Sequence, residues 1–161
     1  MTLRIVICCR DSIMLTRDFT ATTFIVQNAA TLLLWHRKLQ MWLPPGGHID
    51  ANELPHEAAI REVWEETGLH IALHSEPRTM GSVVVLPQPH CILLEPIGPD
   101  HEHIDLIYFG RVIGGTLNPS IRESDGVRWL THAELDDTAI AEDIRVLGRA
   151  AITNYELGIR N

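Results

Sequence analysis

The chain has 161 residues, a length that fits one domain and is enough to bury a sizeable core. Apolar residues make up 45% of it and charged residues 21%, an ordinary globular mixture that argues against a disordered chain. The formal net charge of −8 argues against a nucleic-acid polymer or an anionic membrane as partner, because both are bound by basic patches.

The cysteines and the N-terminal residues predict a cytoplasmic protein. Cys8 and Cys9 are adjacent and Cys91 stands alone, so no disulfide framework is evident and a reducing compartment is expected. The apolar run 3–9 contains Arg4 and is too short for a signal peptide or a spanning helix. Residues 1–18 are an ambiguous N-terminal extension, in which 3–9 is a candidate short strand.

The first half of the chain predicts a hairpin, a break and a helix. Residues 20–26 and 31–36 are the expected strands of the hairpin, joined by a turn at 28–30. The sequence Pro-Pro-Gly-Gly at 44–47 interrupts regular structure. A helix is expected over 55–67, because Pro55 suits the first helical position and Gly68 suits a left-handed C-terminal cap.

The second half predicts mainly strands and a final helix. Thr131-His132-Ala133-Glu134 has the capping-box pattern and should open a short helix. Strands mixed with about three helices imply an α/β fold with helices packed on a sheet. No repeat or linker divides the chain, so residues 1–161 are expected to form a single domain. The expected later elements are strands over 69–73, 81–86, 91–94, 104–112 and 127–130, then an amphipathic helix over 141–157.

Three glutamates are predicted to share one face of the helix over 55–67. A helix turns about 100° per residue, so Glu62, Glu65 and Glu66 fall within an arc of about 100°. Like charges at this spacing destabilise a helix by roughly a few tenths of a kcal/mol per pair. Clustered carboxylates suit Mg²⁺ or Mn²⁺, although such a pattern alone is more often a solvated helix face. The apolar residues at 59, 60, 63 and 64 are expected to pack on the sheet.

The residues around these glutamates favour the metal interpretation. The segment 47–69, GHIDANELPHEAAIREVWEETGL, fits G-x5-E-x7-R-E-U-x-E-E-x-G-U, where U is a bulky aliphatic residue. This pattern is the Nudix box, and the chain resembles the Nudix hydrolase family. The resemblance implies an α/β/α sandwich with a mixed β-sheet and a catalytic strand–loop–helix element. The defined positions of the box are filled by Gly47, Glu53, Arg61, Glu62, Val63, Glu65, Glu66, Gly68 and Leu69.

The resemblance also implies roles for individual residues. Glu62, Glu65, Glu66 and the backbone carbonyl of Gly46 would bind the metal, Mg²⁺ or alternatively Mn²⁺. Glu53 would support the metal cluster, and Arg61 would orient the glutamates. The implied activity is metal-dependent hydrolysis of a diphosphate linkage in a small nucleoside diphosphate derivative, with water attacking phosphorus. Members of the family often pair, so a homodimer is a further expectation, although no residue shows it.

Two positions depart from the usual box. Leu54 stands at the expected helix N-cap, where the family often has Ser or Thr, and such a cap is normally worth about 1 kcal/mol. Asn52 stands where the family often has Gly, and Asn tolerates left-handed backbone angles better than most residues. Neither position belongs to the implied metal ligands.

Candidates outside the box are fewer. Glu123 lies in a loop where a Nudix glutamate can supply a further ligand or the general base; a solvated loop residue is the alternative. His101 and His103 would share a face of a strand and could suggest zinc, but no fourth ligand at finger-like spacing is evident. Surface or loop histidines are therefore the preferred interpretation.

Two other functions remain open. One is a Nudix-fold isomerase of an allylic diphosphate, and the other is a non-catalytic nucleotide-binding regulatory domain. The substrate is equally open among ADP-ribose, nucleotide sugars, dinucleoside polyphosphates and nucleoside triphosphates, because fold does not determine substrate.

Overall fold

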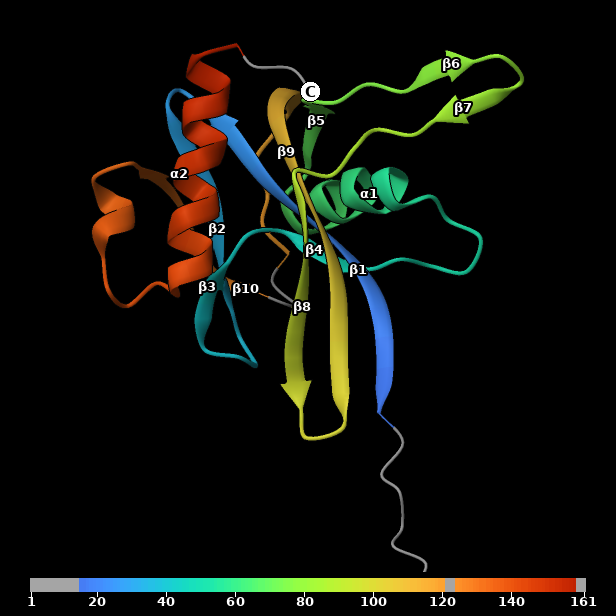
Figure 1. Cartoon of the computed structure of the whole chain (residues 1–161). Coiled ribbons are helices and arrows are strands. Elements are labelled where there is room, and N and C mark those ends of the chain that lie inside the picture. The colour runs from blue at the N-terminus through green and yellow to red at the C-terminus, as the bar shows by residue number, and fades with distance from the viewer. Residues whose placement is uncertain (1–14, 121–123, 159–161) are drawn as a thin grey trace, which may run out of the picture.

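The computed structural model describes residues 15–120 and 124–158. Their main sheet has the central order β10-β2-β1-β9-β5, with β3 paired to β2, β4 to β1 and β8 to β9. The strands β6 and β7 form a separate hairpin that projects away from this sheet (Figure 1). In chain order the elements are β1 (Thr16–Gln27), β2 (Ala30–His36), β3 (Met41–Leu43), β4 (Gly46–His48), α1 (Pro55–Thr67), β5 (Leu69–Leu73), β6 (Arg78–Met80), β7 (Val83–Val85), β8 (Cys91–Gly98), β9 (His101–Gly115), β10 (Ser124–Thr131), the 3-10 turn η1 (Glu134–Asp136) and α2 (Glu142–Glu156).

The sheet is mixed because its two long central strands are parallel. β1 pairs with β9 from Thr16 opposite His101 to Val26 opposite Arg111, whereas the other strand pairs are antiparallel. β1 and β2 are joined by a two-residue turn at Asn28 and Ala29, whose φ angles are 51° and 58°. Positive φ at both turn residues matches the right-handed twist of the strands in a tight hairpin.

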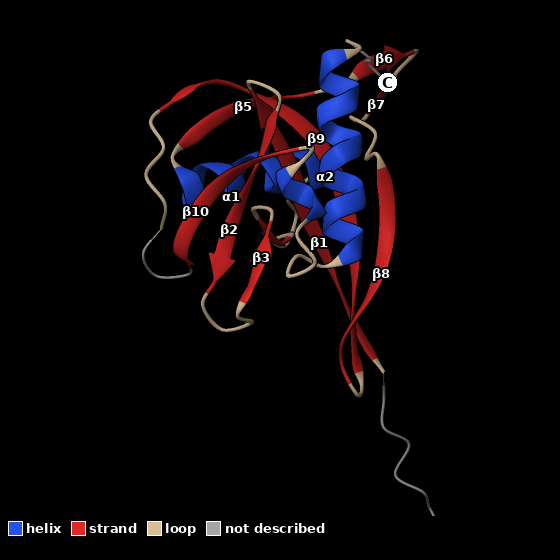
Figure 2. Cartoon of the chain, turned by 90° about the vertical axis from the view of Figure 1, so that its left-hand side faces the viewer, coloured by secondary structure: helices blue, strands red, loops and turns tan. Residues whose placement is uncertain are grey.

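The two helices cover opposite faces of the sheet (Figure 2). On one face, Ile144 and Ile152 of α2 pack with Phe24 and Phe109. On the other face, Ala58 and Ala59 of α1 pack with Ala21 and Tyr108. Successive side chains of a strand point to opposite faces, so neighbouring residues of β1 and of β9 serve the two cores. The expected α/β/α sandwich with a mixed sheet is confirmed.

Several predicted elements are confirmed, and some bounds are wrong. The helix over 55–67 and the strand over 69–73 have their predicted ends. The strand expected over 81–86 is confirmed only for 83–85, because Gly81, with φ at 62°, begins the turn between β6 and β7. The break at 44–47 is confirmed only for its two prolines, since Gly46 and Gly47 pair with β1. The expected short helix after Thr131 is the single 3-10 turn η1.

β9 begins earlier than predicted, at His101, so His101 and His103 lie on a strand and not in a loop. The C-terminal helix runs from 142 to 156, close to its predicted ends. The candidate strand 3–9 lies outside the described residues. Within 15–120 and 124–158, neither helix has the length and apolar character needed to cross a membrane.

Candidate active site

The ends of the acidic helix α1, and the loop that leads into it from β4, are determined by local features of the sequence. Pro55 occupies the first turn, and Gly68 ends the helix with φ at 72° while its N–H donates to the Trp64 carbonyl at 2.8 Å. Asn52, in the loop between β4 and α1, has φ at 69°, as its tolerance of left-handed angles predicted. Leu54 caps the helix without a side-chain acceptor, but its N–H donates to Glu57 Oε2 at 3.2 Å.

Of the three glutamates of α1 predicted to bind metal, Glu62 and Glu66 face the backbone of β4. The N–H of Gly46 donates to Glu66 Oε2 at 3.2 Å, and Glu66 is 9% exposed. A Cβ placed on Gly47 would lie 2.5 Å from Glu62 Oε1 and 2.9 Å from Glu62 Oε2. The lack of a side chain at Gly47 therefore leaves room for the carboxylate of Glu62. The side chain of Glu65 is 49% exposed, so it lies at the solvent side of the cluster.

Arg61 links the carboxylates of the site. Its Nε and Nη2 donate to the two oxygens of Glu53 at 2.7 Å and 2.9 Å, a bidentate pair. Its Nη1 donates to Glu62 Oε1 at 2.6 Å and to Glu65 Oε2 at 3.2 Å. Its Nη2 also donates to the backbone carbonyl of His48 at 3.0 Å, which ties the guanidinium to β4.

These contacts shift the pKa values of Glu53 and Arg61 in opposite directions. The hydrogen bonds from Arg61 hold the pKa of Glu53 below its usual range, with partial burial opposing and the Asp50 N–H at 3.0 Å adding to the effect. The same pair, with a further contribution from Glu62, raises the pKa of Arg61. Both side chains are therefore charged near neutral pH, and their geometry is fixed by ionic hydrogen bonds.

A small cavity of about 40 Å³ opens beside Glu66 and Gly46. Ser120 and Ser124 contribute to its lining, together with side chains from β2 and from the end of β3. The backbone N–H of Ser120 donates to the Glu66 carbonyl at 2.9 Å, which holds this loop near the end of α1. Glu123 lies outside the described residues, so its predicted role remains a prediction.

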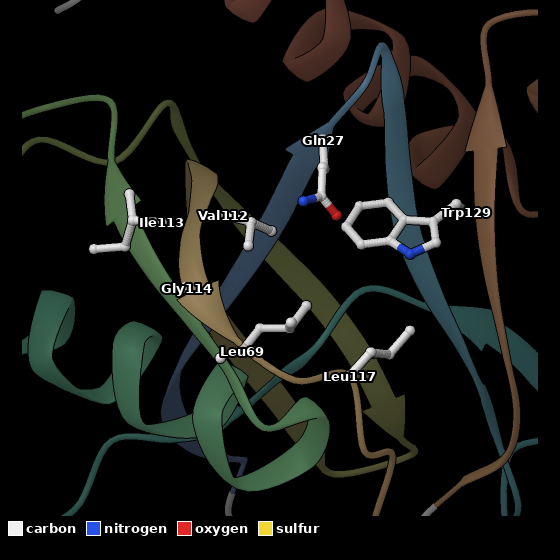
Figure 3. A pocket seen from close by; sticks show the side chains of 8 residues that line it. Gln27, Leu69, Val112, Ile113, Gly114, Leu117 and Trp129 are labelled. Atoms are coloured by element: carbon white, nitrogen blue, oxygen red, sulfur yellow. The ribbon is translucent and has the colours of Figure 1, made fainter.

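A larger cavity, of about 450 Å³, lies at the other end of the sheet (Figure 3). It is lined mainly by apolar residues from the ends of β1, β5, β9 and β10, with Gln27 and Trp129 also in its lining. None of the residues that line it is acidic, basic or histidine. Of the two cavities, only the smaller one is lined by residues that the sequence predicts as metal ligands, Gly46 and Glu66.

One prediction about the apolar residues of α1 needs correction. Ala59 and Val63 are buried as expected, but Ile60 and Trp64 are exposed, because the sheet contacts only the face that carries the small residues. The aromatic residues of the strands differ in burial. Tyr108 and Phe109 are buried in the two cores, whereas Trp42 and Trp129 are partly exposed.

Sequence reasoning missed the backbone partners of the site. The His48 carbonyl and the Asp50 N–H both bind the pair formed by Arg61 and Glu53. Every residue type carries the same backbone groups, so the sequence does not indicate these contacts. They could have been expected only if the short strand β4 had been predicted.

The donor set fits a hard divalent cation. Glu62, Glu65, Glu66 and the Gly46 carbonyl offer oxygen ligands, the type that Mg²⁺ and Mn²⁺ prefer. Arg61 contributes a single positive charge and forms ion pairs with three carboxylates at once. The arginine alone therefore does not neutralise the cluster, and partly buried carboxylates require compensation by positive charge.

Comparisons with known proteins give a consistent result. The NUDIX domain family model matches residues 16–150. A solved NUDIX-family hydrolase from Clostridium perfringens is 34% identical, with a TM-score of 0.77, over 88% of this chain and 99% of that one. An Ap4A hydrolase structure from C. elegans, 18% identical with a TM-score of 0.67, shares the fold.

Two curated relatives carry names that mention nucleotide substrates. A Bacillus subtilis protein, provisionally named an 8-oxo-dGTP diphosphatase, is 28% identical over 120 residues, which are 73% of this chain and 70% of that protein. A human m7GpppN-mRNA hydrolase is 38% identical over 131 residues. That match covers 76% of this chain and 38% of the human protein, so the chain spans much less than half of that relative.

Proposed function

Because the chain belongs to the Nudix family of hydrolases, we propose that it hydrolyses the diphosphate linkage of a small nucleoside diphosphate derivative with Mg²⁺ held by α1. The observation that carries this proposal is the arrangement of Glu62 and Glu66 against the backbone of Gly46 and Gly47. It provides carboxylate oxygens beside the backbone of β4, at the edge of a cavity.

The metal-binding residues in this proposal are Glu62, Glu65, Glu66 and the carbonyl of Gly46. A divalent ion bound there would neutralise the diphosphate, polarise the phosphorus and lower the pKa of the attacking water. Glu65 is the most exposed of the three glutamates, so it lies where solvent and substrate can reach it. Glu123 is a candidate for the general base that accepts the proton of the attacking water, because the adjacent residue Ser124 lines the cavity.

Glu53 and Arg61 are positioning residues in this proposal. Arg61 fixes the orientation of Glu62 and Glu65 while it is itself fixed by Glu53 and by the His48 carbonyl. A network of this kind orients the ligands before substrate binds, and its loss typically costs about 10- to 100-fold in metal affinity or activity.

The test is product release across a panel of diphosphate compounds. The panel contains ADP-ribose, nucleotide sugars, dinucleoside polyphosphates and nucleoside triphosphates, each with Mg²⁺, with Mn²⁺ and with chelator. Glu66→Gln keeps the shape of the side chain and removes its charge, so we expect turnover to fall by at least about a hundredfold. Glu156→Gln is the matched control, because Glu156 is an exposed residue at the end of α2.

Product identity also separates the alternatives. Release of phosphate or nucleotide that stops with chelator and in Glu66→Gln supports the hydrolase. An isomerised diphosphate without release would establish the isomerase instead. A folded protein that binds metal but turns over none of the panel would contradict the proposal and favour a binding domain.

A further inference from the structure

A second cluster of ligand-type side chains lies at the beginning of β1 and β9. The parallel pairing of these strands places Asp18 opposite His103 and Thr16 opposite His101. β4 pairs with β1 on its other side and places His48 opposite Thr20. Residues two apart on a strand share a face, so the three strands bring one aspartate and three histidines together.

The distances within this cluster suit a single ion. Asp18 Oδ2 lies 3.6 Å from His48 Nε2 and 3.6 Å from His101 Nε2. One ligand atom from each of Asp18, His101 and His103 can be chosen so that all three lie within 4.8 Å of one another. Tetrahedral zinc with bonds of about 2.0–2.1 Å holds its ligand atoms roughly 3.3 Å apart. Small side-chain rotations would therefore close the set around an ion.

The third histidine, His48, lies beside these ligands. The rings of His48 and His103 have centroids 5.0 Å apart, and those of His101 and His103 are 5.1 Å apart, both edge to face. His48 thus borders the same space as the other two rings. The ligands that the sequence did not reveal are Asp18 of β1 and His48 of β4, which are far along the chain from the His101-Glu102-His103 segment.

Two further polar side chains, Thr16 and Asp105, lie beside the ligands of the cluster. The Thr16 hydroxyl lies 2.9 Å from His101 Nδ1, which leaves Nε2 directed at Asp18. Such a hydrogen bond on the second ring nitrogen is typical of metal-bound histidines. Asp105, on the same face of β9 as His103, is 4% exposed, and its Oδ1 has no hydrogen-bond partner among the described residues. A buried carboxylate oxygen without a protein partner is commonly satisfied by a bound water or ion.

We propose that Asp18, His48, His101 and His103 bind a divalent transition-metal ion, Zn²⁺, at a site separate from the glutamates of α1. Imidazole nitrogens and a carboxylate oxygen suit zinc, whereas Mg²⁺ prefers a shell of oxygens only. Asp18 lies on β1 an even number of residues from Phe24, so it shares the sheet face that α2 covers, opposite α1. The site does not depend on the proposed hydrolase activity.

The site is nevertheless joined to the catalytic element through β4. The His48 side chain borders the cluster, while its backbone carbonyl accepts a hydrogen bond from Arg61 Nη2 at 3.0 Å. Gly46 and Gly47, which face Glu66 and Glu62, are on the same three-residue strand. A zinc ion would therefore fix β4 to β1 and β9, and would raise the melting temperature of the protein by binding only the folded state.

The test is a metal titration of the full, untagged chain after chelator treatment, in excess Mg²⁺ to occupy the glutamates. Co²⁺ serves as the optical probe and Zn²⁺ is then titrated against a chromophoric chelator. The site variants are Asp18→Asn, His48→Ala and the double variant His101→Ala/His103→Ala. The controls are His70→Ala, an exposed histidine of β5, and Glu66→Gln.

We expect one tightly bound Zn²⁺ and the visible bands of tetrahedral Co²⁺ without a thiolate charge-transfer band. The double variant should lose both, and Asp18→Asn and His48→Ala should each weaken Zn²⁺ binding by at least about tenfold. His70→Ala and Glu66→Gln should bind as the unchanged chain does. Zn²⁺ affinity that is equal in the unchanged chain and in all site variants would overturn the proposal, as would loss of binding in Glu66→Gln alone. Asp18 and His48 are about half exposed, so their variants answer the question even where the double variant folds poorly.

Discussion

At the scale of single residues, Gly47 shows how a motif position serves a neighbouring side chain. Its φ angle is not positive, so the backbone alone would accept other residues. The constraint comes from Glu62, whose carboxylate occupies the place where a Cβ would stand. Glycine at this position therefore protects the location of a proposed metal ligand and is not required by the turn.

Gly47→Ala should consequently damage activity more than stability. The new methyl group would displace the flexible end of Glu62, so we expect kcat/KM to fall by about 10- to 100-fold with little change in melting temperature. The measurement is steady-state turnover of the substrate found in the panel, paired with thermal unfolding. Gly98→Ala is the matched control, because a Cβ there meets nothing within 4 Å. Unchanged turnover in Gly47→Ala would show that Glu62 does not act from its present position.

The residue scale also shows which sequence predictions hold and why. The left-handed backbone at Asn52 and the cap at Gly68 were predictable, because both depend on the residue itself. The pairing of Asp18 with His101 was not predictable, because it depends on strands that are neighbours only in the folded chain. The roles of Glu53 and Arg61 remain predictions, although their bidentate contact is the geometry that those roles require.

At the scale of elements, the N-terminus of α1 has only one of the two hydrogen bonds of a capping box. Glu57 accepts the N–H of Leu54, but Leu54 offers no oxygen to the first helical N–H groups in return. The φ and ψ of Leu54, −82° and 144°, are already those of an N-cap residue. A serine would therefore need no backbone change to complete the capping box.

Leu54→Ser should raise the free energy of unfolding by about 0.5–1 kcal/mol. The side chain of Leu54 is exposed, so little buried surface is lost. Leu54→Ala is the matched control, since it removes the same apolar atoms without adding a hydroxyl. Denaturant unfolding of the two variants measures the difference. Equal stability of Leu54→Ser and Leu54→Ala would refute the capping argument.

Elements also differ in how far local sequence determines them. The ends of α1 were predicted correctly because Pro55 and Gly68 are local signals. The strands β3 and β4 were missed because each has three residues and exists only through its pairing with β2 or β1. β9 extends beyond its apolar run in both directions because its partners continue to offer backbone hydrogen bonds, β1 and β8 at its beginning and β5 at its end.

At the scale of the whole molecule, the packing of three elements brings acidic side chains together. The antiparallel pairing of β8 with β9 places the buried Asp105 near Glu95 of β8, and Asp143 of α2 adds a third negative charge to their surroundings. Burial, followed by the charges of Asp105 and Asp143, raises the pKa of Glu95 to about 7. The overall fold thus destabilises the ionised form of Glu95 through contacts that no single element would have.

This destabilisation by Glu95 depends on pH in a defined direction. In the unfolded chain Glu95 should titrate near its ordinary pKa of 4.5, whereas in the folded chain it titrates near 7. Between these values the folded state holds the extra proton, so the free energy of unfolding should fall as pH rises through this window. Above it the destabilisation is complete, and Glu95→Gln, which cannot ionise, should remove it.

We therefore expect Glu95→Gln to raise the free energy of unfolding by about 1 kcal/mol at about pH 8, a value discounted for solvent screening, and by almost nothing at pH 4.5. Denaturant unfolding at both pH values measures this, with chelator present so that no metal ion binds at the neighbouring His103. Glu95→Asp keeps the negative charge and should keep the pH dependence of the unchanged chain. A gain in Glu95→Gln that is the same at both pH values would mean that side-chain packing, and not the charge of Glu95 beside Asp105 and Asp143, determines the stability at this position.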